Sequence, residues 1–180
     1  MTEIPPTLSI FGFKNSGKTT IASAATEHFT SQGLRVLAVK HVGKPSFSLD
    51  HEGTDSHRFA KAGATGVLLH SDSSTALLLS RPATQLAPLL QLGVAATSAN
   101  VVILEGFKSW THHHKEIAKV ICLRSTSEIP ELSENIQGEV LAICTLTPSV
   151  TEALLIPDQL PELLQRLDDW LANATSFKME

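Results

Sequence analysis

Eight residues near the N-terminus, Gly12 to Thr19, constrain this chain most, because they match the P-loop pattern G-x-x-x-x-G-K-T. The apolar run Leu8 to Phe11 before them is typical of a buried strand, and Thr20 to Thr30 carries apolar residues at helical spacing. In such a strand–loop–helix unit, backbone N–H groups and the helix N-terminus face an anion. The sequence therefore predicts a nucleoside triphosphate site; a glycine-rich turn with a chance lysine would not explain the flanks.

The residues of this loop have separate predicted tasks. Two glycines let the backbone approach a polyphosphate without an intervening Cβ. Lys18 is expected to reach the β- and γ-phosphate oxygens, and the Thr19 hydroxyl is expected to ligate Mg²⁺. The predicted phosphate-binding set is Gly12, Asn15, Ser16, Gly17, Lys18, Thr19 and Thr20.

The rest of the chain alternates apolar strand patterns with helical ones, which favours a mostly parallel α/β sheet. Seven Phe, two Trp and no Tyr leave a core of aliphatic residues, as in parallel sheets covered by helices. Strands are expected at 34–39, 99–104, 117–123 and 140–143, an added β-hairpin at 66–70 and 75–80, and helices at 55–62, 82–92 and 160–171. We therefore predict a P-loop NTPase-type three-layer α/β/α fold. It should form one nucleotide-binding domain over residues 1–180, with residues 1–6 and 174–180 frayed.

Charge and hydropathy exclude several classes of partner. The net charge of −4 argues against a nucleic-acid partner, which needs a broad basic surface. No apolar run approaches the ~20 residues that span a bilayer, and the N-terminus lacks a signal pattern. Cys122 and Cys144 lie inside apolar runs, which favours buried reduced thiols over a disulfide or a metal pair. We expect a cytoplasmic protein.

A carboxylate lies at the carboxyl end of the clearest predicted strand. Val101 to Leu104 is apolar, and Glu105 and Gly106 follow it. An acid at the carboxyl end of a central strand is where P-loop proteins place the group that supports Mg²⁺ or its water. Glu105 is therefore a candidate catalytic and metal residue, the alternative being a solvated strand end. Lys108 follows within reach of the nucleotide.

The second predicted strand also ends in polar residues, Lys40 and His41, which we expect near the phosphates or a second ligand. His41 suits a neutral hydrogen-bonding or metal-binding imidazole, and also an ordinary loop position. Asp50 and Asp55, on either side of Gly53, are candidates for metal–water contacts. Asp55 equally suits the N-cap of the helix that follows it.

Two further segments say less about function. His112 to His114 are consecutive and therefore poorly spaced for one zinc ion, which favours a flexible solvated loop with at most transient metal binding. The chain also lacks the Asn-Lys-x-Asp run by which many GTPases recognise guanine, so the residues themselves do not reveal base preference.

Taken together, these segments resemble the MobB family, the GTP-binding adaptor proteins of molybdopterin-guanine dinucleotide synthesis. The resemblance covers about residues 7 to 125, and the paired Lys-His and Glu-Gly-Phe-Lys runs are its most specific parts. The matching segments, in chain order, are Gly12 to Thr20, Val39 to His41, Gly53 to Phe59, Lys61 to Ala64, Ile103 to Lys108, and Glu116 to Val120 with Arg124. The histidine-rich connection after Lys108 departs from the family pattern, and no base-reading residue is apparent in the C-terminal region.

The resemblance implies a homodimer that binds GTP and Mg²⁺ at the P-loop and hydrolyses GTP slowly at most. It also implies work beside a MobA-type guanylyltransferase, and leaves contact with molybdopterin or a molybdoenzyme open. By position, Lys18 and Thr19 would hold phosphates and Mg²⁺, and Glu105 would be the second-motif acid. The family's Lys-His pair and Gly-x-Asp segment fall on Lys40, His41 and Asp55.

Two other functions remain as alternatives. A small-molecule kinase would use the same P-loop with an acceptor base such as Asp50 or Asp55, but no arginine-rich lid stands out. A GTP-driven metal chaperone is suggested by the histidine run. For GTP hydrolysis, Arg58 and Arg81 are the nearest arginine candidates.

Overall fold

The computed structural model describes residues 3–43 and 52–179 of the chain. It divides into two compact units, one formed by residues 1–41 and 86–180 and the other by residues 42–85. The first unit contains the P-loop and the large sheet, and the second contains a hairpin and one short helix. The expectation of one domain over the whole chain stays a prediction.

The first unit is built on a six-stranded sheet in the order β2-β5-β1-β6-β7-β8, in which every pairing is parallel. The strands are β1 (Thr7–Gly12), β2 (Val36–Lys40), β5 (Val101–Glu105), β6 (Ile117–Leu123), β7 (Val140–Thr145) and β8 (Leu154–Leu155). This confirms the predicted mostly parallel α/β sheet. Because β1 lies between β5 and β6, the loop that follows β1 emerges at the centre of the carboxyl edge of the sheet.

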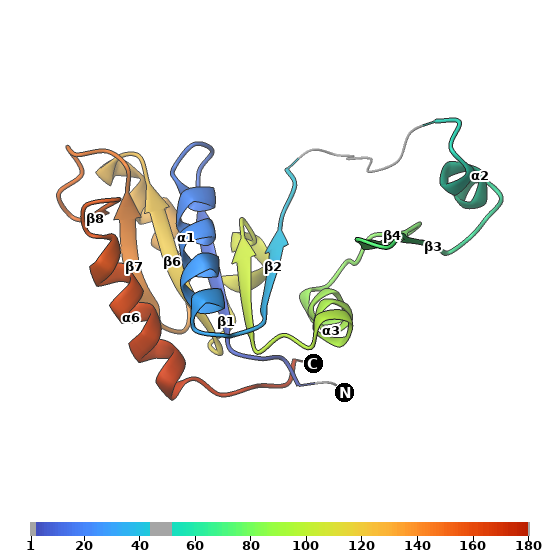
Figure 1. Cartoon of the computed structure of the whole chain (residues 1–180). Coiled ribbons are helices and arrows are strands. Elements are labelled where there is room, and N and C mark those ends of the chain that lie inside the picture. Colours follow the sequence, from blue (N-terminus) through green and yellow to red (C-terminus); the bar gives the residue numbers. More distant parts are fainter. Residues whose placement is uncertain (1–2, 44–51, 180) are drawn as a thin grey trace. The chain divides into compact units, whose positions relative to one another are not determined.

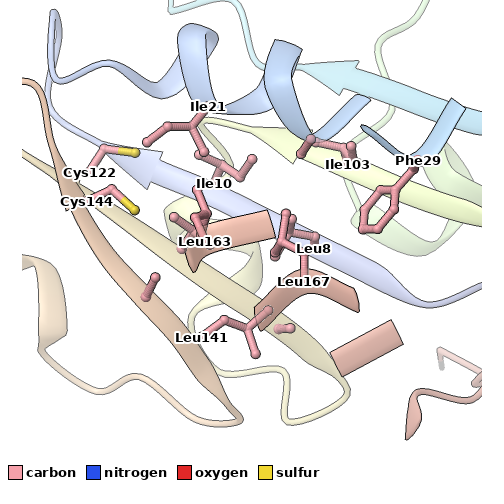
Figure 2. Close-up of a cluster of buried hydrophobic side chains, with 14 of the residues drawn as sticks. Leu8, Ile10, Ile21, Phe29, Ile103, Cys122, Leu141, Cys144, Leu163 and Leu167 are labelled. Carbon is pink, nitrogen blue, oxygen red and sulfur yellow. The ribbon is translucent and has the colours of Figure 1, made fainter. Parts of the chain in front are cut away.

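Two 14-residue helices, α1 (Lys18–Ser31) and α6 (Leu160–Asn173), cover one face of this sheet. Figure 1 shows them side by side in front of the strands. Each buries a stripe spaced four residues apart, with Ile21, Ala25 and Phe29 on α1 and Leu163 and Leu167 on α6. Figure 2 shows four of these side chains with Leu8 and Ile10 of β1 in the core between the sheet and both helices, namely Ile21, Phe29, Leu163 and Leu167.

The other face is covered by α3 (Leu86–Thr97), the short α4 (Lys108–Thr111) and α5 (Ile129–Ser133), which completes the three layers. The prediction placed α3 at residues 82–92 with Pro82 in its first turn. The helix instead begins at Leu86, and Pro88 lies in the first turn, where a missing N–H costs no helical hydrogen bond. Leu90 and Val94 then face Val102 and Leu104 of β5.

The two cysteines lie side by side on neighbouring strands. Cys122 of β6 is in register with Cys144 of β7, and both are free and buried. Figure 2 shows them among the side chains of the same core. Burial raises the pKa of both thiols, to about 12 for Cys144. The prediction that both thiols are buried is confirmed.

Near both termini of the first unit, described residues pair with each other, whereas the predicted fraying of residues 1–6 and 174–180 includes positions outside the described residues and stays a prediction. The backbone N–H of Ile4 donates to the Phe177 carbonyl at 2.8 Å, and the Phe177 N–H donates back to Ile4 at 2.9 Å. Ile4 and Met179 are both buried in the α3 side of the core. The polar composition of the tail concealed these two apolar anchors.

The second unit contains α2 (Asp55–Lys61) and an antiparallel hairpin of β3 (Gly66–His70) and β4 (Thr75–Leu79). The predicted added hairpin is confirmed. Within residues 42–43 and 52–85 of this unit, Val67 is the one buried residue. Three leucines on the opposite hairpin face, Leu68, Leu77 and Leu79, are 65%, 45% and 49% exposed. None of the described helices is long and apolar enough to cross a membrane.

Candidate nucleotide-binding site

The P-loop conformation depends on close approaches that only glycine permits. A Cβ on Gly12 would lie 2.1 Å from the carbonyl oxygen of Cys122, on the neighbouring strand. Gly17 has a φ of +89°, and its Cβ would lie 2.8 Å from Cγ of Leu146. Asn15 also adopts a left-handed conformation, with φ of 63°. The loop therefore curls tightly over the end of the sheet, as a phosphate cradle requires.

Polar groups inside the curl fit an anion. Ser16 is 2% exposed, and among the described residues its Oγ has no hydrogen-bond partner. Gly17 is the N-cap of α1, and no side chain caps the N–H groups of the first turn. A buried hydroxyl and uncapped helix amides are donors that a phosphate satisfies, so the observed loop fits a bound polyphosphate. Ser16 and Gly17 belong to the predicted phosphate-binding set, whose role stays a prediction.

Lys18 belongs to the same curl. Its Nζ donates to the carbonyl oxygen of Phe13 at 2.6 Å, so the side chain folds back over the loop. This holds the ammonium group above the residues that would cradle the phosphates. A cation at this place complements the negative charge of a polyphosphate.

Thr19, Lys40 and Glu105 meet at the carboxyl edge of the sheet. The Thr19 hydroxyl donates to Glu105 Oε1 at 2.8 Å. Lys40 Nζ lies 2.8 Å from both carboxylate oxygens of Glu105 and 3.3 Å from Thr19 Oγ1. The structure thus brings together two of the three residues predicted to contact metal, Thr19 and Glu105, with Lys40 beside them. Hydroxyl and carboxylate oxygens are the donors that Mg²⁺ prefers, so this pair fits the metal chemically.

His41 and Lys108 lie close to this cluster in sequence but point elsewhere. The His41 ring packs edge-on against Phe107, with centroids 5.4 Å apart, while its backbone N–H donates to the Glu105 carbonyl at 2.9 Å. The Lys108 ammonium donates to the carbonyl of Glu131 on α5. The partners of these two side chains are thus Phe107 and Glu131, and their part in ligand binding stays a prediction.

The structure places only one of the two aspartates that were predicted to contact a metal ion. Asp50 lies outside the described residues. Asp55 begins α2 in the second unit, where its carboxylate pairs with Arg58 at 3.2 Å. The alternative that Asp55 caps this helix is wrong by one residue, because the Thr54 hydroxyl accepts the N–H of His57. The predicted contact of Asp55 with a metal ion stays a prediction.

The histidine run forms a turn after α4 and is less solvated than expected. His112 Nδ1 donates to the Lys108 carbonyl at 2.9 Å, and His112 and His114 are half-buried. Burial, followed by the neighbouring His113, lowers the pKa of His114. Among residues 3–43 and 52–179, no three histidine, cysteine or acidic side chains gather as metal ligands.

One residue beside the P-loop was absent from the predicted site. Arg124 follows β6, and its guanidinium lies over the Phe13 ring, 5.4 Å from the centroid. Glu128 holds it through an ion pair of 2.5 Å. Burial alone would raise the pKa of Glu128, but hydrogen bonds from the Arg124 backbone and guanidinium lower it. The sequence feature that could have identified Arg124 is its place directly after the carboxyl end of a predicted strand.

The model of the protein family "Molybdopterin guanine dinucleotide synthesis protein B" (MobB) matches residues 7–146. The chain belongs to the MobB family. The molybdopterin-guanine dinucleotide biosynthesis adapter protein of Haemophilus influenzae is 30% identical over 169 residues, covering 92% of this chain and 89% of that protein. The adapter protein of Escherichia coli is 25% identical over 169 residues, covering 92% and 93%.

Solved MobB structures share the fold. The structure of Bacillus subtilis MobB superposes with a TM-score of 0.70 at 24% identity, over 91% of this chain and 96% of that chain. A MobB homolog from Bacillus stearothermophilus gives 0.66 at 22% identity, over 92% and 97%. The segment matched by the MobB family model begins with β1 and ends just after β7, so it includes Thr19, Lys40 and Glu105.

Proposed function

We propose that this MobB-family protein is an adaptor of molybdopterin-guanine dinucleotide biosynthesis that binds GTP with Mg²⁺ at its P-loop. The observation that carries the proposal is the meeting of Thr19 and Glu105 beside the loop, 2.8 Å apart. Lys18 would hold the β- and γ-phosphates, and the Thr19 and Glu105 oxygens would hold the metal or its water. The metal supplies charge neutralisation for the triphosphate.

Hydrolysis of the bound GTP should be slow. Fast hydrolysis needs a group that orients the attacking water and a cation that stabilises the negative charge on the γ-phosphate in the transition state. In the first unit, Arg124 lies at the P-loop through Phe13, but Glu128 already pairs with its guanidinium. The site is suited to holding nucleotide more than to turning it over. A rate near one per second for the protein alone would contradict this.

The adaptor should act as a homodimer, with the hairpin of the second unit as the contact to a second copy. An isolated two-stranded hairpin is marginal in water. Its exposed leucine face, Leu68, Leu77 and Leu79, is uncharged, and apolar side chains of this size favour a partner that covers them. A second copy offers the same self-complementary face. We place the dimer in the cytoplasm, where free buried thiols such as Cys122 and Cys144 stay reduced.

Calorimetric titration with GTP and with ATP, each with Mg²⁺, tests nucleotide binding. Lys18→Ala should weaken GTP binding by about tenfold or more, since a hydrogen bond to a charged group contributes about 1.5–3 kcal/mol. Lys115→Ala, which removes an exposed charge before β6 at the opposite edge of the sheet, should bind as wild type. Tighter binding of ATP than GTP would contradict the assignment and favour the kinase.

The pathway assignment has its own test. Addition of the protein to a MobA-type guanylyltransferase, with molybdopterin and GTP, should raise the yield of molybdopterin-guanine dinucleotide. Lys18→Ala should lose this effect, and Lys115→Ala should keep it. An equal yield with and without the adaptor would contradict the proposal.

The dimer is tested by sedimentation. Leu68→Glu places a charge on the hairpin face and should shift the protein to monomer. Leu92→Glu is the matched control, because Leu92 is 40% exposed on α3 in the first unit. Monomeric wild type, or equal dissociation of both variants, would contradict the hairpin interface.

A further inference from the structure

We propose that Lys40 is a built-in cation that occupies the metal position between Thr19 and Glu105 and must leave when magnesium arrives with nucleotide. This inference rests on the proposed function for the position of the metal. It adds a competition between a side chain of the protein and the metal ion. The consequence is that free metal binds poorly and the metal–nucleotide complex binds well.

The geometry of the ammonium group supports this role. Lys40 Nζ contacts three oxygens, the two of the Glu105 carboxylate at 2.8 Å and Thr19 Oγ1 at 3.3 Å. An ammonium group has three protons, so this cluster uses its whole hydrogen-bonding capacity. The oxygens are the same ones that would face Mg²⁺. The ammonium therefore substitutes for the metal in charge and in partners.

Burial explains why a cation is needed at this position without nucleotide. The Glu105 side chain is 13% exposed, and a carboxylate so shielded from water is costly unless it is paired. The Lys40 side chain, by contrast, is 57% exposed on the edge strand β2. Its flexible stem can move into solvent without disturbing the core. The pair thus combines a fixed anion with a removable cation.

The two cations cannot share the position. Mg²⁺ requires near-octahedral oxygen ligands at about 2.0–2.1 Å, which leaves no room for an ammonium hydrogen-bonded to the same oxygens. Like charges at such a distance also repel. Magnesium alone offers no interaction that offsets the free-energy cost of displacing Lys40. A triphosphate does, because it adds further oxygen ligands and four negative charges. Metal binding is in this way coupled to nucleotide binding.

Manganese binding to the nucleotide-free protein, followed by electron paramagnetic resonance, tests the competition directly. Wild type should bind Mn²⁺ weakly, and Lys40→Met should bind it about tenfold tighter or more, the scale of one charge-assisted hydrogen-bonding group. A double variant that combines Lys40→Met with Glu105→Gln should lose this gain in Mn²⁺ affinity. Lys115→Met removes the same charge at the opposite sheet edge and should behave as wild type. No gain in Lys40→Met, or an equal gain in Lys115→Met, would overturn the proposal.

Nucleotide titrations with Mg²⁺ and with a chelator separate this idea from a simple phosphate-binding role. In Lys40→Met, the GTP affinity with Mg²⁺ should rise relative to the GTP affinity with a chelator, because the metal no longer competes with a lysine. An equal loss of affinity with and without Mg²⁺ would mean that Lys40 is a phosphate ligand, and would overturn the proposal. If wild type binds no nucleotide at all, the proposed function fails, while the manganese result still decides the competition.

Discussion

The Thr19 hydroxyl donates a hydrogen bond to Glu105 Oε1 at 2.8 Å, although 86 positions separate the two residues in sequence. The parallel pairing of β1 with β5 creates this contact, because Ile10 is in register with Glu105. The loop after β1 then passes directly over the carboxyl end of β5. A fold-level rule, that ligands bind at the carboxyl ends of parallel strands, becomes here a contact between two side chains.

Glu105→Gln should remove most of the effect of Mg²⁺ on nucleotide affinity. The amide has nearly the same shape but lacks the negative charge that metal binding requires. Affinity with Mg²⁺ should fall about 10- to 100-fold, the scale of one charge-assisted contact, and affinity under chelator should not fall. Glu116→Gln, an exposed acid before β6, is the control for charge. An equal loss under both conditions would assign Glu105 to nucleotide rather than to metal.

Gly12→Ala should damage the P-loop itself. The new methyl group would lie 2.1 Å from the Cys122 carbonyl oxygen, so backbone must move. Overpacking of this kind costs about 1–3 kcal/mol of unfolding free energy, and nucleotide binding should be lost with it. Chemical denaturation measures the first effect and calorimetry the second. Gly43→Ala, whose Cβ would meet no atom of the described residues within 4 Å, should leave stability unchanged; wild-type stability in Gly12→Ala would refute the steric argument.

The sequence predicted the elements around the P-loop well, because a motif, a buried run and a helical stripe all agreed there. It also placed Lys40 and Glu105 at strand ends. It did not predict that they pair, because the order β2-β5-β1 makes neighbours of strands 65 residues apart. The short α4, α5 and β8 were missed for a related reason: elements of two to five residues are stabilised by tertiary contacts more than by local pattern.

Ile4 should contribute to stability as a core residue, although it precedes the first strand. It is fully buried among Leu90, Val102 and Met179. Ile4→Ala should lower the free energy of unfolding by about 2–5 kcal/mol and Ile4→Val by about 0.5–1.5 kcal/mol. Urea denaturation of the two variants provides a graded test. If both variants unfold like wild type, the terminal pairing with Phe177 does not hold in solution.

Lys119 is a buried cation with a structural task. It is fully buried on β6, and its ammonium donates to the carbonyl oxygens of His114, Ile117 and Gln137. These bonds tie the turn before β6 to the segment before β7. Lys119→Met leaves three acceptors unsatisfied and should cost about 3 kcal/mol or more, since each orphaned buried group costs about 1–3 kcal/mol. Lys115→Met, an exposed neighbour, should have little effect.

The pH dependence of stability gives a second test of Lys119. Burial lowers the pKa of Lys119 from 10.5 to about 8, and Glu116 opposes part of the shift. Between those values the unfolded chain binds more protons than the folded one, so this group makes stability rise with pH from about 8 to 10.5. The two buried thiols act in the opposite direction, but both proteins contain them. The stability difference between wild type and Lys119→Met should therefore widen over this range, and a constant difference would show that the ammonium keeps its ordinary pKa despite its burial.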